Sequence, residues 1–174
     1  LLAARSLMDS PMTRILCALL LVLSPAIGGE LRGRVIGIAD GDTITVLIDR
    51  TPLTVRLHGI EAPQKKQPFG TRAKQTASAL AFDQTVKVEI TDRDRYGRAV
   101  GIIHLRDGRI LNQELVKAGM AWWYRKYAPK DSVLASLENE ARQAKRGLWS
   151  DPNQVPPWEW RRGRTVAAGS KAAL

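Results

Sequence analysis

The strongest constraint on the fold of this chain is a run of three short β-forming segments joined by turns too short to hold a helix. The segments cover residues 33–38, 43–48 and 53–58, and β-branched residues are frequent in them. Asp-Gly-Asp at 40–42 separates the first two segments, and Asp-Arg-Thr-Pro at 49–52 separates the second and third. Strands joined by such short turns lie antiparallel and adjacent, so we expect a three-stranded meander.

Alternation along the third segment assigns its two faces. Successive side chains of a strand point to opposite sides, so Val55 and Leu57 are expected to face the core. Arg56 and His58 then lie together on the opposite face. Pro63 and Pro68 exclude regular structure from there to about residue 69.

The rest of the chain alternates helices and strands. Apolar spacing predicts a helix that begins at Thr71 as N-cap and buries Ala73, Ala77, Leu80 and Ala81. Two strands are expected at 86–90 and 99–105, followed by an Asp-Gly turn at 107–108. A short helix over 112–118 and a last helix complete the domain. Asp131 or Ser132 caps that last helix, Gly147 follows it, and its apolar face is Leu134, Leu137, Ala141 and Ala144.

Five short strands with a helix between the third and the fourth are typical of one small architecture. The pattern predicts an α+β domain built on a five-stranded OB-fold β-barrel, with about three α-helices. Such barrels often bind nucleic acids or sugars on one face.

The two ends of the chain differ from this domain. Residues 1–28 are expected to hold an upstream stretch and a secretory signal peptide, with the apolar run at 15–23 followed by small residues. An uncleaved membrane anchor is the alternative. The only cysteine, Cys17, lies in that run, so the mature protein would have no disulfide or thiolate chemistry. Residues 29–150 form the expected domain, and residues 151–174 a Pro-rich and then basic flexible tail. We therefore expect a secreted or periplasmic protein with no stable membrane insertion after signal removal.

Charge narrows the class of partner. Lys and Arg outnumber Asp and Glu by 27 to 17, which makes the formal net charge +10. A protein this basic is expected to meet a polyanion, such as nucleic acid, an anionic membrane surface or an acidic cell-surface polymer. A basic surface that only aids solubility is the plainer alternative.

Three short motifs supply the chemistry. They are Asp-Gly-Asp-Thr at 40–43, Arg-Leu-His-Gly-Ile-Glu-Ala-Pro-Gln at 56–64 and Asp-Arg-Tyr-Gly-Arg at 94–98. Carboxylates hold hard cations such as Ca2+, and the planar fork of arginine donates two hydrogen bonds to a phosphate. Each motif alone is an ordinary turn or charged loop. As an ordered set they predict a site for cleaving phosphodiesters.

In these motifs the chain resembles the staphylococcal nuclease (thermonuclease) family, over about residues 33–150. The resemblance implies an OB barrel with three helices and a Ca2+-dependent endonuclease that hydrolyses DNA and RNA with little sequence preference.

The resemblance also implies roles for single residues. Arg56 and Arg98 would bind the phosphate in the transition state, while Asp42, Glu61 and the carbonyl of Ala62 would bind the metal. Arg95 and Tyr96 would grip a terminal phosphate, and Tyr127 would pack against the nucleotide. We expect a monomer.

Two positions depart from the family pattern. Glu61 stands where the family usually has Asp, and Gln64 stands where it has the glutamate credited with activating water. A neutral amide orients water but does not accept a proton near pH 7, and this loss is worth about a hundred- to ten-thousand-fold in rate. His58 is an alternative base, and a hydroxide bound to the cation is an alternative nucleophile. A weak or inactive nucleic-acid-binding module on the same fold is therefore the alternative function.

Overall fold

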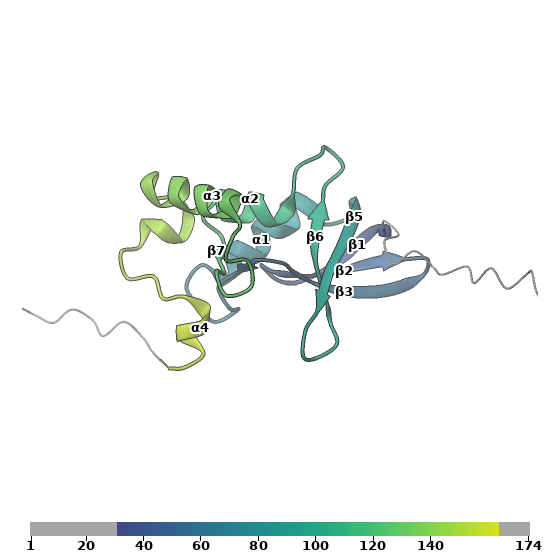
Figure 1. The fold of residues 1–174 in the computed structure, drawn as a ribbon, viewed down its shortest axis with the longest axis horizontal. Coiled ribbons are helices and arrows are strands. Elements are labelled where there is room, and N and C mark those ends of the chain that lie inside the picture. Colours follow the sequence, from purple (N-terminus) through teal and green to yellow (C-terminus); the bar gives the residue numbers. More distant parts are fainter. Residues whose placement is uncertain (1–30, 164–174) are drawn as a thin grey trace, which may run out of the picture.

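A computed structural model describes residues 31–163, and a closed five-stranded barrel forms one half of it (Figure 1). Around the barrel the strands follow the order β1-β2-β3-β6-β5. Their bounds are β1 (Leu31–Asp40), β2 (Thr43–Ile48), β3 (Thr51–Leu57), β5 (Thr85–Arg93) and β6 (Ala99–His104). Three longer helices, α1 (Gly70–Ala81), α2 (Leu111–Lys117) and α3 (Ser132–Gln143), complete the α+β fold. The predicted OB-fold barrel is confirmed.

The barrel closes through one parallel pair of strands. β1, β2 and β3 form the expected antiparallel meander, and β5 pairs antiparallel with both β1 and β6. β3 and β6 are parallel, with Val55 opposite Ala99 and Leu57 opposite Gly101. Arg98 therefore lies one position before the Val55–Ala99 pair, at the level of the middle of β3.

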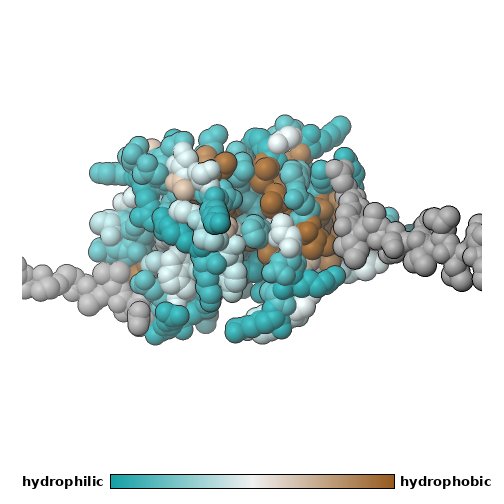
Figure 2. Space-filling model, in the orientation of Figure 1, coloured by the Kyte–Doolittle hydropathy of each residue, from teal (hydrophilic) through white to brown (hydrophobic). Residues whose placement is uncertain are grey.

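The side chains of β3 face the core and the outside as the sequence predicts. Val55 and Leu57 are fully buried, whereas Arg56 between them is half-buried. The buried face of α1 is made of alanines at 73, 77 and 81, which allow its backbone to approach the barrel closely. Figure 2 shows that hydrophilic side chains cover most of one face, with the hydrophobic ones gathered on the half that holds the barrel.

A small second sheet was not predicted. β4 (Ile60–Glu61) pairs antiparallel with β7 (Trp122–Trp123), so that Glu61 lies opposite Trp122. Trp122 is buried and meets Trp149 edge to face, with ring centroids 5.7 Å apart. This sheet ties the loop after β3 to the chain between α2 and α3.

One helix boundary and one apolar face differ from prediction. The N-cap of α1 is Phe69, in the left-handed conformation at φ 66°, so Thr71 lies inside the helix and does not cap it. Asp131 caps α3 as expected, since its side chain accepts a hydrogen bond of 2.9 Å from the backbone N–H of Leu134. Ala144 was expected on the buried face of α3, but it follows the helix as its C-cap and is exposed.

The chain continues against the domain beyond the expected boundary at residue 150. After a 3-10 turn (Gly147–Ser150), a one-turn helix α4 (Pro157–Trp160) lies beside β7 (Figure 1). Trp158 of α4 stacks on Tyr124, with ring centroids 5.1 Å apart and planes at 16°. The first part of the expected tail is thus in contact with the domain, which was not predicted.

The remaining expectations for the two ends fall outside the described residues. These are the signal peptide within residues 1–28 and the end of the tail at 164–174. Within residues 31–163 no helix has the length and apolar character needed to cross a membrane.

A buried carboxylate joins α3 to β7 and generates a stability prediction. Glu138 is 2% exposed; it accepts a hydrogen bond of 3.1 Å from the backbone N–H of Trp123, and it pairs with Arg125 and Arg142. Glu138→Ala would leave a buried donor unsatisfied, so we expect a loss of about 1–3 kcal/mol in the free energy of unfolding. Urea denaturation measures it.

Glu140→Ala is the matched control on the same helix. Its side chain is exposed and makes one long contact, 3.5 Å, with Ser136. We expect its unfolding free energy to change by less than about 0.5 kcal/mol. Equal losses in the two variants would contradict the role given to Glu138.

Candidate active site

Pairing between β2 and β3 brings the first carboxylate to the first arginine. Thr43 lies opposite Arg56 in the register, which places Asp42 beside the Arg56 guanidinium. Arg56 Nη1 is 3.5 Å from Asp42 Oδ1, and Asp42 is only 4% exposed. Asp42 also accepts hydrogen bonds from Thr43 Oγ1 at 3.1 Å and from the backbone N–H of Ala62 at 2.8 Å.

The second carboxylate comes from β4. Glu61 is 1% exposed, and its Oε1 lies 3.5 Å from Arg56 Nη2. The other oxygen, Oε2, is buried and has no hydrogen-bond partner among the described residues. Arg56 is therefore held between two buried carboxylates, one on each side of its fork.

Small residues allow the β1–β2 turn, the loop after β4 and α1 to approach one another closely. A Cβ on Gly41 would lie 2.7 Å from the Cβ atoms of both Ala62 and Ala73. Gly41 and Ala62 are thus required by packing between the β1–β2 turn, the loop after β4 and α1. The structure shows the N–H of Ala62 bound to Asp42; the expected metal contact of its carbonyl stays a prediction.

Burial changes the acidity of Asp42. Loss of water around the carboxyl raises its pKa from the ordinary 3.8 to about 7, although the guanidinium of Arg56 lowers it. Asp40, whose Oδ1 accepts the N–H of Asp42 at 3.3 Å, raises it further. The protein thus holds Asp42 where a positive charge close to it would be strongly favourable.

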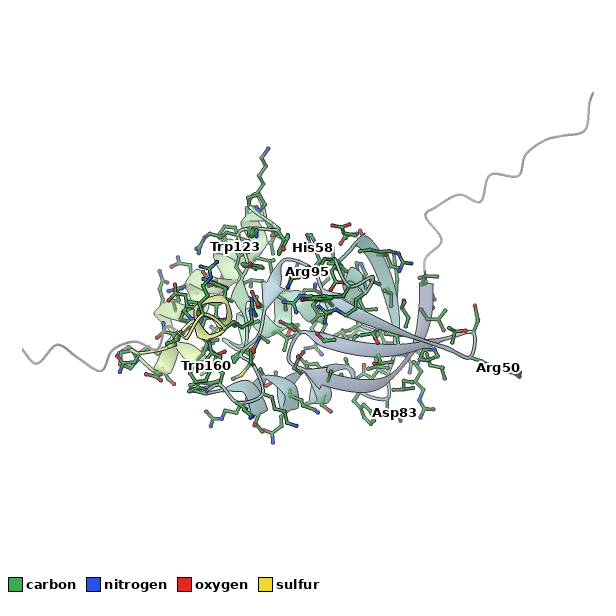
Figure 3. The ribbon with its side chains drawn as sticks, turned by 90° about the horizontal axis from the view of Figure 1, so that it is seen from below. Arg50, His58, Asp83, Arg95, Trp123 and Trp160 are labelled. Carbon is green, nitrogen blue, oxygen red and sulfur yellow. The ribbon has the colours of Figure 1, made fainter. Side chains whose placement is uncertain are left out.

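Arg98 belongs to a second group, on the hairpin between β5 and β6. Its Nε donates to Asp94 Oδ2 at 2.6 Å, and its backbone N–H donates to Asp94 Oδ1 at 3.0 Å. Its guanidinium lies 5.6 Å from the centre of the Tyr96 ring, and that of Arg95 lies 4.7 Å from the same centre. Arg95 and His58 lie near the middle of the molecule, far from Arg50 at the end of the barrel (Figure 3).

Three predicted residues lie outside these two groups of contacts. The backbone N–H of Gln64 donates to Gln67 Oε1 at 3.1 Å, and Gly70 packs so tightly on Gln64 that a Cβ there would be 2.0 Å from its carbonyl oxygen. Tyr127 is 62% exposed and meets Tyr124 edge to face at 5.1 Å. The Nδ1 atom of His58 lies 3.2 Å from Thr91 Oγ1 on β5.

Arg161 is the residue that sequence reasoning missed. It follows α4, and its Nη1 binds Glu61 Oε1, the same oxygen that faces Arg56. The only signal in the sequence is the group Trp-Glu-Trp-Arg at 158–161, because aromatic residues are unusual in a mobile tail.

The side chains at this site supply part of the oxygen ligands that a hard cation needs. Among residues 31–163, no group of three or more His, Cys, Asp or Glu side chains is arranged to hold a metal ion. Two carboxylates nevertheless converge on Arg56, and Glu61 presents a buried oxygen without a partner. Ca2+ accepts carboxylate and carbonyl oxygens together, so these residues suit it when carbonyl groups or water complete the shell.

Comparison with known proteins places the chain among nucleases. It is 47% identical over 137 residues to a protein named uncharacterized endonuclease from Escherichia coli O157:H7, covering 79% of this chain and 89% of that one. It is 42% identical over 157 residues to the micrococcal nuclease of Shigella flexneri, covering 85% and 90%. A staphylococcal-like nuclease of Arabidopsis thaliana, CAN1, is 40% identical over 110 residues, which cover 63% of this chain and 33% of that protein.

The family follows from a match that spans more than half of the chain. The model of the staphylococcal nuclease homologue family matches residues 54–151. The chain belongs to this family, and the expectation of a nuclease is confirmed.

The raised pKa of Asp42 predicts a pH dependence of stability in the metal-free protein. Between pH 4 and pH 7 the folded state binds more protons than the unfolded state, so its stability falls as the pH rises through this window. Asp42→Asn removes the effect. From pH 4 to pH 8 in EDTA, we expect the variant to gain roughly 2–4 kcal/mol over the native chain.

Asp49→Asn, in the exposed turn between β2 and β3, is the control and should follow the native chain at every pH. Urea unfolding at each pH gives the free energies. A difference between Asp42→Asn and the native chain that stays constant from pH 4 to pH 8 would contradict the burial argument.

Proposed function

We propose that this chain is a secreted or periplasmic, Ca2+-dependent endonuclease that hydrolyses phosphodiester bonds of DNA and RNA with little sequence specificity. The observation that carries the proposal is the placement of Arg56 between the buried carboxylates of Asp42 and Glu61. A fixed cationic fork beside buried anionic oxygens serves both a phosphate and a cation at one place.

The arginines would act on the charge that develops in the transition state. Arg56 is oriented by two carboxylates, and Arg98 is oriented by two hydrogen-bonded contacts with Asp94. A guanidinium held in place before the reaction stabilises the pentacovalent phosphorus without reorganising. Because guanidinium groups stay protonated, this stabilisation is available over the whole physiological pH range.

Asp42 and Glu61, with the Ala62 carbonyl, would hold the cation. When bound, Ca2+ would polarise a phosphoryl oxygen and offset its charge. Glu61 is one methylene longer than the usual Asp, and its Oε2, which is buried without a hydrogen-bond partner, is the atom that would contact the cation. The Asp42 carboxyl, whose pKa burial raises to about 7, would be fully ionised once a cation is present.

Gln64 would orient the attacking water without accepting its proton. The side-chain oxygen of an amide accepts a hydrogen bond from water, so the residue positions the nucleophile but leaves it less reactive. The loop that carries it is well supported, because the backbone N–H of Gln64 donates to Gln67 Oε1 and the backbone N–H of Gln67 donates to the carbonyl of Gln64.

Recognition would rest on phosphates and on stacking. Arg95 and Tyr96 would grip a terminal phosphate, and exposed Tyr127 would stack on a base. These contacts read no base edges, which supports low sequence specificity.

The net charge of +10 supports a polyanionic substrate, and the apolar run at 15–23 supports secretion. We propose that the enzyme acts as a monomer. The alternative of an inactive binding module is not favoured, because the relatives carry nuclease names.

Metal dependence and Arg98 test the proposal. On single-stranded DNA, we expect cleavage with Ca2+, none in excess EDTA, and a fall in kcat of about a hundredfold or more in Arg98→Ala. A gel assay with labelled DNA measures it. Arg106→Ala, an exposed arginine in the turn after β6, should keep the native rate. Cleavage that persists in EDTA would overturn the Ca2+ proposal.

The missing base gives a second test of the mechanism. Gln64→Glu restores a group that accepts a proton, so we expect kcat with Ca2+ to rise about tenfold or more at every pH at which the new carboxylate is ionised. Initial rates from pH 6 to pH 9 measure this. Gln75→Glu adds the same charge to an exposed position of α1 and should leave the rate unchanged. An equal response in both variants would remove Gln64 from the site.

A further inference from the structure

We propose that Arg161, from the segment after α4, is a third arginine that contacts the phosphate backbone of the bound nucleic acid. It lies outside residues 54–151, which the family model matches. The inference rests on the proposed function, because it extends the phosphate site of Arg56, and its test separates the two.

Two guanidinium groups converge on one oxygen. Glu61 Oε1 faces Arg56 Nη2 at 3.5 Å and also binds Arg161 Nη1. A shared acceptor places the two cationic forks next to each other, although the residues lie far apart in the chain. Neighbouring forks repel each other, so this arrangement favours an anion near both of them.

Both forks keep donors for a further partner. A guanidinium has five N–H donors. Arg161 contacts Glu61 through Nη1, while Arg56 contacts Glu61 through Nη2 and Asp42 through Nη1. The side chain of Arg161 is 44% exposed and that of Arg56 is 25% exposed, whereas the side chain of Glu61 is buried. The carboxylate is therefore at the base of the site and the free donors face solvent, where a phosphate would arrive. Arg161 would bridge Glu61 and a phosphate oxygen.

The segment that carries Arg161 is anchored at several points. Trp158 stacks on Tyr124 and meets Trp122 edge to face at 6.4 Å. Gln67 Nε2 donates to the carbonyl of Val155, which ties the segment to the loop that holds Gln64. The backbone N–H of Arg161 donates to the carbonyl of Pro157 at 3.1 Å. These contacts hold the arginine in position before the substrate binds, which reduces the entropic cost of the contact.

The competing explanation is that Arg161 is only a brace, a residue that holds the Glu61 carboxylate in place without touching the nucleic acid. The salt dependence of DNA binding separates the two roles. A residue that contacts a phosphate adds to the slope of log affinity against log salt concentration, by about 0.7 for each contact on single strands. A brace stabilises the fold without changing this slope. The probe is a fluorescein-labelled single-stranded DNA oligonucleotide in EDTA, which prevents cleavage, and fluorescence anisotropy measures binding between 50 and about 300 mM salt.

For Arg161→Ala we expect about tenfold weaker binding and a slope reduced by about 0.7. Arg161→Lys keeps the charge and should recover most of the slope but only part of the affinity, because an ammonium lacks the fork. Arg162→Ala is the matched control: it removes the next arginine, which is exposed and for which the described residues show no ion pair. Its slope should change by less than half as much. Thermal unfolding confirms that each variant is folded.

A slope in Arg161→Ala equal to that of Arg162→Ala would overturn the inference and leave Arg161 as a brace for Glu61. Arg56→Ala, measured in the same way, distinguishes this failure from that of the proposed function. If Arg56→Ala reduces the slope and Arg161→Ala does not, only the third arginine is lost. If neither reduces it, the phosphate does not bind at this site, and both proposals fail.

Discussion

The parallel pairing of β3 with β6 is the constraint on which the rest of the structure depends. It closes the barrel and brings the hairpin with Arg98 alongside the strand with Arg56. On the other edge of β3, the antiparallel pairing with β2 places Asp42 beside the same arginine. One central strand therefore organises both sides of the site. An open sheet would leave the two arginines on separate edges.

The charges at this site are costly for the fold. Taking carboxylates such as Asp42 and Glu61 out of water costs several kcal/mol each, and a nearby arginine offsets this only partly. The raised pKa of Asp42 and the unpartnered oxygen of Glu61 are both signs of incomplete compensation. A domain selected only for stability would replace such groups with apolar ones. Under the proposed function their presence is explained by the cation and the phosphate that these groups would bind.

Sequence patterns predicted the barrel well because its elements are local. Alternation in β3 separated Val55 and Leu57 from Arg56, and the Asp131 cap followed from a single side chain and its neighbours. Prediction failed where distant contacts decide. Thr71 is a good cap by propensity, but the tight packing of Gly70 on Gln64 moves the start of α1 to Phe69. The segment after residue 150 has the composition of a linker, and it is held in place by contacts with distant residues, the stacking of Trp158 on Tyr124 and the pairing of Arg161 with Glu61.

The sequence by itself determined the strand periodicity, the positive charge and the types of group at the site: carboxylates, arginines and an amide in place of an acid. These follow from residue type and short-range spacing. The tertiary structure alone decided which of them meet. Glu61 and Arg161 are 100 positions apart and bind each other, while Arg98 is held by its own hairpin. Such pairings depend on barrel closure and on the packing of tryptophans, which no local pattern encodes, because they arise from burial over the whole domain.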